Sequence, residues 1–191
     1  LAGGQTKVIT VHYQIKDAQA AWVDQTATLS VAGLNDAPLI SVNPVSANYI
    51  NDGSVQSVFS GTVVDVVDGG QKVKGLKLSV AGVTGSGDER LTIDGTEVSL
   101  VNGVTGTTGA QAVVYGVSVS GSTASVTLSH ATGLSAALAQ TLVDGLSYRN
   151  VSVLGMSGHR VVTLTEISDS GSDHNSSALN WASTLQDALK P

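Results

Sequence analysis

The sequence predicts an all-β protein, a β-sandwich with one short helix that is preceded by a β-hairpin. Three features of the 191-residue chain indicate this fold. Val and Thr, which favour strands, are frequent, and 22 glycines supply turns. Apolar and polar residues alternate with a period of two over many short stretches. Turn signals separate these stretches at short intervals, which is typical of a sandwich.

The hairpin is predicted from two alternating stretches near the N-terminus. Residues 7–15 place Ile9, Val11, Tyr13 and Ile15 on one face, and residues 21–32 alternate in the same way. We expect the apolar face to point inward, because a lone hairpin is at best marginally stable. Residues 1–36 are interpreted as the C-terminal strands of a preceding domain or as a split part of the main sandwich.

The main sandwich is assigned to residues 37–191. Its expected strands are 39–43, 46–50, 57–65, 75–83, 90–94, 96–101, 113–119, 124–129, 160–167 and 178–185. Residues 135–145 instead have apolar positions near helical spacing, with Ser135 as N-cap and Gly145 as a left-handed exit. We therefore expect one short helix over an end or seam of the sandwich.

Composition excludes several function classes. The net charge of −6 argues against nucleic-acid binding, and the absence of Cys removes disulfides, thiolate catalysis and Cys-type zinc sites. No apolar run is long enough to span a membrane. The four histidines have no paired ligand spacing, and no Gly-x-Ser-x-Gly elbow is present. We predict that the protein is not an enzyme.

The joint between the two parts is Gly33-Leu34-Asn35-Asp36-Ala37-Pro38. Pro38 cannot donate to a sheet ladder and pushes Ala37 toward an extended backbone. Asn35 and Asp36 place side-chain oxygens just before this rigid point. A stiff, oxygen-rich joint between two β-domains suits a hard cation such as Ca²⁺.

Calcium binds six to eight oxygens, so any site here must be assembled from several loops. The candidate metal ligands lie in turns and are Asn35, Asp36, Asn51, Asp52, Asp65, Asp68, Asp88, Glu89, Glu166, Asp169 and Asp173, with Asn175 beside the last. The pairs Asn51/Asp52 and Asp65/Asp68, together with the linker pair, are the favoured shared site. The alternative is that turn acids only cap the backbone. Asp144 is interpreted as a solvated residue.

Several motifs, taken in order, carry a family resemblance. They are the joint Leu34-Asn35-Asp36-Ala37-Pro38, then Val64–Gly70, Gly75–Val80, Asp88–Gly95, Leu146–Asn150 and Arg160–Gly171. In this order they resemble the cadherin-like or VCBS-type repeats of large RTX-type bacterial adhesins. The chain departs from that family in two ways. It lacks the Gly-Gly-x-Gly-x-Asp array, and Asn51-Asp52-Gly53 stands where such repeats more often carry an acidic residue beside glycine.

The resemblance implies an Ig- or cadherin-like sandwich that is secreted and held at the bacterial cell surface. It implies a calcium-stabilised rigid extender that contributes to cell adhesion and biofilm formation, with neighbouring repeats of the same adhesin as partners. The alternative is a calcium-dependent module that binds a peptide terminus or glycan near the adhesin tip, with loops 102–112 and 168–178 as pocket walls. The chain is then expected to be a segment of a longer protein whose export signal lies outside it.

Overall fold

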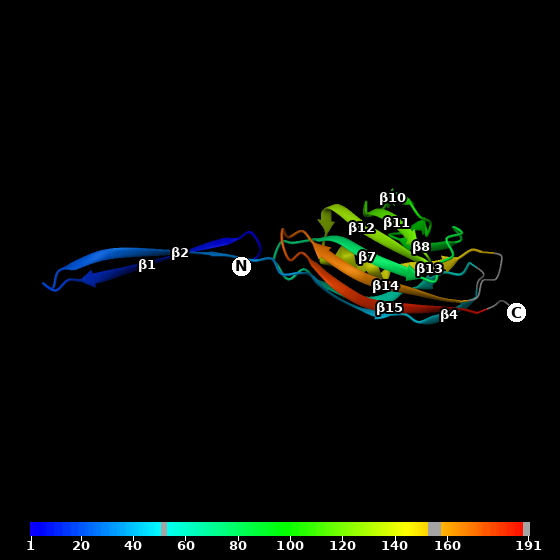
Figure 1. Ribbon diagram of the computed structural model, residues 1–191, viewed down its shortest axis with the longest axis horizontal. Coiled ribbons are helices and arrows are strands. Elements are labelled where there is room, and N and C mark those ends of the chain that lie inside the picture. The colour runs from blue at the N-terminus through cyan, green and yellow to red at the C-terminus, as the bar shows by residue number, and fades with distance from the viewer. Residues whose placement is uncertain (51–52, 153–157, 189–191) are drawn as a thin grey trace.

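The computed structural model describes residues 1–50, 53–152 and 158–188. It confirms the predicted fold class, because the chain is mostly β-sheet with one short helix. A long hairpin projects from one end of a β-sandwich (Figure 1). Every stretch predicted as a strand overlaps a strand of the structure, and two short strands were not predicted, β10 (Thr105–Thr107) and β13 (Ser147–Asn150).

The larger sheet of the sandwich has seven strands. Their order is β10, β11 (Val114–Ser120), β12 (Thr123–Leu134), β7 (Val73–Ala81), β14 (Gly158–Asp169), β15 (Ser176–Ala188) and β4 (Ala47–Ile50). Neighbouring strands are antiparallel except β4, which runs parallel to β15.

The smaller layer consists of two short antiparallel sheets. One has the order β5 (Gln56–Ser57), β13, β8 (Glu89–Ile93) and β9 (Thr96–Ser99), and the other pairs β3 (Leu39–Pro44) with β6 (Phe59–Asp65). Apolar residues that alternate along these strands meet those of the larger sheet in one core. The low aromatic content leaves Val, Leu and Ile to fill it, with Phe59 and Tyr148 as its largest fully buried side chains.

A bulge in β14 changes which residues face the core. Val162 and Leu164 point inward, but the register against β7 shifts between Leu164 and Glu166, and the next core residue is Ile167. A bulge inserts one extra residue, so the parity of the inward positions reverses. Two residues after Ile167, Asp169 therefore also lies on the buried side, at the end of the strand.

The predicted helix is α1 (Ala136–Asp144), and the side chain of Ser135 accepts a hydrogen bond from the backbone N–H of Leu138. The predicted left-handed exit is wrong, since Gly145 has a φ of −83°. Asp144 is exposed, as predicted for a solvated residue, but it also has a structural contact that was not predicted. Its Oδ1 accepts from the backbone N–H of Thr62 at 3.0 Å and from the Thr62 hydroxyl at 2.6 Å, which ties α1 to β6.

The hairpin is formed by β1 (Thr6–Lys16) and β2 (Trp22–Ala32), as the alternation predicted. The expectation that its apolar face is buried is wrong within the described chain, because every residue of both strands is exposed. It extends away from the sandwich along the long axis of the molecule (Figure 1). The two-unit interpretation of residues 1–36 and 37–191 remains a prediction.

Candidate metal centre at the linker

The linker is fastened to two loops at one end of the sandwich. The backbone N–H of Asp36 donates to Asp68 Oδ2 at 3.0 Å, in the turn that follows β6. The hydroxyl of Ser177, at the start of β15, donates to the carbonyl of Pro38 at 2.7 Å. Asn35, between these loops, is only 2% exposed. The Pro-containing joint is thus fixed to the sandwich by hydrogen bonds at several points.

Asn35 lies at the centre of this group. Its Nδ2 is 3.3 Å from Asp169 Oδ1, at the end of β14, and 3.3 Å from the carbonyl oxygen of His174, in the β14–β15 turn. Its Oδ1 is contacted by Nε2 of Gln71, which is also 3.4 Å from Asp68 Oδ2. A chain of polar contacts therefore joins Asp68 to Asp169 through two amide side chains.

Asp169 is the most unusual residue in this chain of polar contacts. It is 2% exposed, and its Oδ1 also accepts from the backbone N–H of Gly171 at 2.8 Å. Its Oδ2 is buried and has no hydrogen-bond partner within the described residues, and the same is true of Oε1 of Gln71. A buried carboxylate oxygen without a partner costs free energy, so an orphan here points to a missing partner.

The donor set fits calcium. It offers carboxylates from Asp68 and Asp169, amide oxygens from Asn35 and Gln71, and the His174 carbonyl, all of which are hard oxygens. Asn35 Nδ2 donates across both 3.3 Å separations, so Asn35 presents an oxygen to Asp169 and to the His174 carbonyl only when its amide is turned over. Exchange of the Asn35 oxygen and nitrogen by a half-turn also requires the Gln71 amide to turn, because Gln71 Nε2 donates to Asn35 Oδ1.

The site does not resemble a transition-metal centre. Nowhere in the described chain do three or more His, Cys, Asp or Glu side chains gather in a group that holds a metal ion. The candidate site therefore depends on amide and backbone oxygens as much as on carboxylates. Calcium tolerates such a mixture, whereas zinc sites are built from Cys, His and carboxylate ligands.

The structure brings together only part of the predicted shared site. Asn35 and Asp68 both contact Gln71, whereas Asp36 is exposed and reaches Asp68 through its backbone N–H and not through the predicted carboxylate. Asp65 does not join them, because it is exposed and its Oδ1 accepts from the backbone N–H of Val67 at 2.8 Å in a local turn. Asn51 and Asp52 lie outside the described residues.

The other predicted ligands lie elsewhere. Glu166 pairs with Lys77 at 3.0 Å on the exposed side of the larger sheet. Asp173 is exposed and lies 3.7 Å from the ring of His174. Asp88 accepts from the Ser86 hydroxyl at 3.0 Å. Glu89 is buried beside Arg160, and both of its oxygens are already used within the protein.

Sequence reasoning missed two contributors to the site. Gln71 was not considered, because a lone Gln after a Gly-Gly turn has no pattern of its own. The His174 carbonyl is a backbone group, which composition does not reveal. Asp169 was placed in a different cluster from the linker pair, since nothing local shows that the β14–β15 turn folds back onto Asn35.

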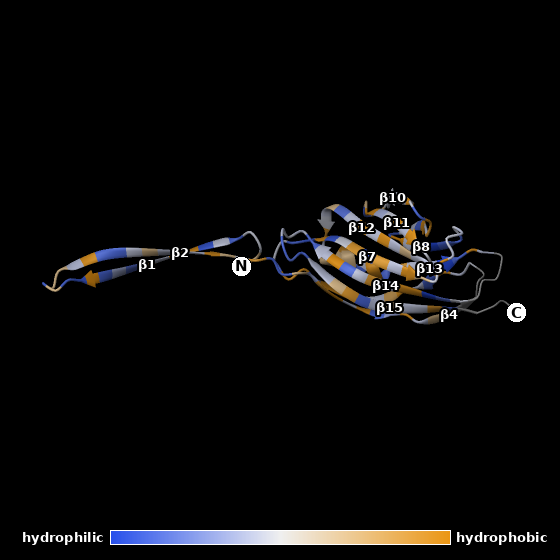
Figure 2. Ribbon diagram, in the orientation of Figure 1, coloured by the Kyte–Doolittle hydropathy of each residue, from blue (hydrophilic) through white to orange (hydrophobic). Residues whose placement is uncertain are grey.

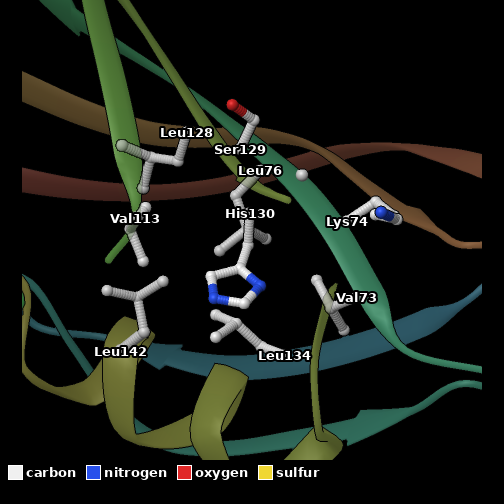
Figure 3. A pocket seen from close by; sticks show the side chains of 10 residues that line it. Val73, Lys74, Leu76, Val113, Leu128, Ser129, His130, Leu134 and Leu142 are labelled. Atoms are coloured by element: carbon white, nitrogen blue, oxygen red, sulfur yellow. The ribbon is translucent and has the colours of Figure 1, made fainter. Parts of the chain in front are cut away.

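The sandwich also has a small, partly open cavity between α1 and the larger sheet. Val113, Leu134, Leu142 and the ring of His130 face it (Figure 3). Nδ1 of His130 is buried and makes no hydrogen bond to any described residue. The cavity volume of about 10 Å³ leaves room for at most one water molecule. This cavity is too small for an organic ligand.

The fold defines the class of this protein as a β-sandwich, with a polar cluster where the linker meets it. No family model, curated protein or solved structure matches the chain. No helix within the described residues is long and apolar enough to cross a membrane.

Gly171 is expected to be essential to this site. A Cβ at this position would overlap the side-chain amide of Asn35. We predict that Gly171→Ala displaces Asn35 and lowers the free energy of unfolding by about 1–3 kcal/mol, measured by urea denaturation. Gly109→Ala is the matched control, because nothing lies within 4 Å of a Cβ there. Equal losses for the two variants would contradict the close approach.

Proposed function

We propose that this protein is a calcium-stabilised extracellular module of a bacterial surface adhesin, in which the ion stiffens the joint before the sandwich. The observation that carries the proposal is the buried, unpartnered Oδ2 of Asp169, next to Asn35 of the linker. The ordered motifs that resemble adhesin repeats support the adhesin context. Cell adhesion and biofilm formation, as a rigid extender between neighbouring repeats, are the roles that follow from it.

Each residue of the site has a distinct part in this proposal. Asp68 and Asp169 supply negative charge from two loops of the sandwich, and Asn35 supplies the linker's own oxygen. Gln71 lies between Asn35 and Asp68, and its unpartnered Oε1 would add a further oxygen ligand. Calcium, when bound, neutralises the two carboxylates and joins the linker to both loops. The β-hairpin that directly precedes the linker is then held in one direction.

The proposal is tested by thermal unfolding in millimolar calcium and after chelation. A ligand that binds only the folded state adds about 2.7 kcal/mol at 100 times its dissociation constant. For a chain of this size, we expect the midpoint to rise by roughly 5–11 °C. Magnesium should have a smaller effect, because it demands a tighter octahedral geometry.

Two matched variants test whether the calcium-dependent rise in the unfolding midpoint arises at the linker site. Asp68→Asn should remove most of the calcium-dependent rise, whereas Asp173→Asn should keep it, since Asp173 is an exposed residue of the β14–β15 turn. A midpoint that is the same with calcium and with chelator would exclude the proposal.

A further inference from the structure

In the described chain, the hairpin is joined to the sandwich at its base alone. Every residue of β1 and β2 is exposed, including the apolar residues that recur along both strands (Figure 2). Among the residues that the structure describes, no hydrogen bond of either strand reaches the sandwich. The direction in which the hairpin projects (Figure 1) is therefore set by the two segments at its base, residues 1–5 and the Gly33–Pro38 linker.

The first residues of the chain form a closed turn at this base. The backbone N–H of Gln5 donates to the carbonyl of Ala2 at 3.0 Å, and the N–H of Ala2 donates to Oε1 of Gln5 at 3.1 Å. Between them, Gly4 has a φ of 78°, a conformation that favours glycine. The N–H of Gly33 donates to the Gln5 carbonyl at 2.7 Å and ties the turn to the end of β2. We call residues 2–5 the base turn.

The base turn lies directly against Asn35 of the linker. A Cβ at Gly3 would lie 2.8 Å from the Cβ of Asn35 and 2.9 Å from its backbone nitrogen, closer than real Cβ atoms approach. Gly3 does not have a positive φ, so the close approach, and not the backbone conformation, favours glycine there. A Cβ at Gly33 would likewise lie 2.7 Å from the carbonyl carbon of Leu1. The two segments at the base are thus packed backbone to backbone.

Asn35 is contacted along the whole of its side chain. Gly3 lies against its Cβ and backbone, whereas Gly171 lies against its amide group. The amide donates to Asp169 and to the carbonyl of His174, which fixes it to the end of β14 and to the turn that follows. One continuous path of close contacts therefore runs from the base turn, through Asn35, to the buried carboxylate of the candidate metal site.

We propose that Gly3 is a positioning residue for Asn35, and that it couples the direction of the hairpin to ion binding at the linker. This inference rests on the calcium site proposed above. Because β1 begins at Thr6, directly after the base turn, a rotation of the hairpin moves the turn as well. Gly3 then leaves Asn35, and the linker amide loses the support that holds it beside Asp169.

The coupling acts in both directions. An ion that fixes Asn35 also fixes the base turn, and with it both strands of the hairpin. Conversely, a pull that turns the hairpin lowers the calcium affinity, because coupling between two sites is reciprocal. Strands of 11 residues at about 3.3 Å per residue make the hairpin about 36 Å long, so it is a long lever on a small contact. The position of the hairpin thus regulates the linker site.

Calorimetric titration of the full chain with calcium tests the positioning role. Gly3→Ala should raise the dissociation constant by roughly tenfold, which is within the usual range of coupling between two sites. Gly69→Ala is the matched control and should leave the constant unchanged, since it lies beside Asp68 but nothing lies within 4 Å of a Cβ there. Equal constants for the two variants would overturn the proposal.

A second variant separates a movement of the hairpin base from a local disturbance of Asn35. Gly33→Ala places a Cβ against the backbone of Leu1 and displaces the base turn from the other strand. It should also raise the dissociation constant, by a smaller factor than Gly3→Ala. An unchanged constant would show that Gly3→Ala acts on Asn35 alone, and it would overturn the coupling to the hairpin.

Spin labels measure the direction of the hairpin with and without calcium. The chain has no Cys, so Thr28→Cys on the hairpin and Ser129→Cys on the larger sheet, both exposed positions, introduce the two label sites. In chelator, the distribution of distances between the labels should be broader in Gly3→Ala than in Gly69→Ala. Calcium should narrow the distribution in the parent and leave it broad in Gly3→Ala.

These measurements separate the failure of this inference from the failure of the calcium site. If calcium neither binds to the parent nor narrows its distribution, the proposed calcium site is wrong, and the widths in chelator decide whether Gly3 positions the linker. Equal widths for Gly3→Ala and Gly69→Ala in chelator would overturn the inference even if calcium binds.

Discussion

Glu89→Gln is expected to lower the free energy of unfolding by about 3–5 kcal/mol, because it breaks a buried ion pair by removing one charge. Glu89 and Arg160 are 1% and 3% exposed. Glu89 Oε1 accepts from Nε of Arg160 and, at 3.1 Å, from the Tyr148 hydroxyl. Its Oε2 accepts from the backbone N–H of Thr84 at 2.6 Å and from the Thr84 hydroxyl at 2.9 Å.

The physical reason is the low dielectric of the core. The Arg160 guanidinium stays charged at any accessible pH, so in the variant it remains buried without its carboxylate. Gln fills the same volume, which separates the loss of charge from the loss of packing. The amide also brings two N–H donors to a pocket whose other groups are donors, and this adds to the loss.

Urea denaturation measures the effect, and an exposed ion pair provides the control. Glu166→Gln removes the partner of Lys77, in a pair whose side chains are 33% and 52% exposed. Its expected cost is at most about 1 kcal/mol, because solvent screens the charges. Similar losses for Glu89→Gln and Glu166→Gln would show that the Glu89 network contributes no more than a surface pair.

Glu89 also shows where sequence reasoning ends. Asp88 and Glu89 look alike as adjacent acids after a Gly-rich turn, and both were predicted as ligands. Strand alternation turns Glu89 inward, toward an arginine 71 residues away in sequence, and leaves Asp88 in the loop. The partner that decides the role of Glu89 is long-range, so no local pattern reveals it.

The sequence predicts the strands better than it predicts the site. The pattern of a strand is local, whereas the contacts of the site join residues that are far apart in the sequence. Alternation located β1 and β2 closely, because each strand carries its own signal. It missed β13, whose four residues are too few to show a period and three of which are buried. The site depends on a bulge near Thr165 that brings Asp169 to the buried side, and on a turn that folds onto Asn35. Neither the bulge nor the turn can be recognised from a pattern in the local sequence.

Asp169→Asn is expected to change the stability in opposite directions with and without calcium. In chelator, the variant should be more stable than the parent by about 1 kcal/mol. The parent buries a carboxylate whose Oδ2 has no hydrogen-bond partner within the described residues, and this charge is costly without an ion. Asn keeps the oxygen that accepts from Asn35 and Gly171 and removes the charge.

In millimolar calcium the order should reverse. The parent gains the binding free energy, about 2.7–4.1 kcal/mol when calcium exceeds its dissociation constant by 100- to 1,000-fold. The variant lacks the anionic ligand and gains little, so it becomes the less stable protein by about 2–3 kcal/mol. Thermal unfolding of both proteins in both buffers measures the crossing, and Asp65→Asn serves as the control because Asp65 is exposed and lies outside the cluster.

A purely structural role for Asp169 predicts a different pattern. If Asp169 only organises the β14–β15 turn through Gly171 and Asn175, its replacement acts equally in both buffers. Nonspecific screening by calcium would shift the Asp65→Asn control as much as Asp169→Asn. Only an ion bound at Asp169 predicts that the stability difference between parent and variant changes sign between the two buffers. If the sign does not change at saturating calcium, Asp169 is not a metal ligand.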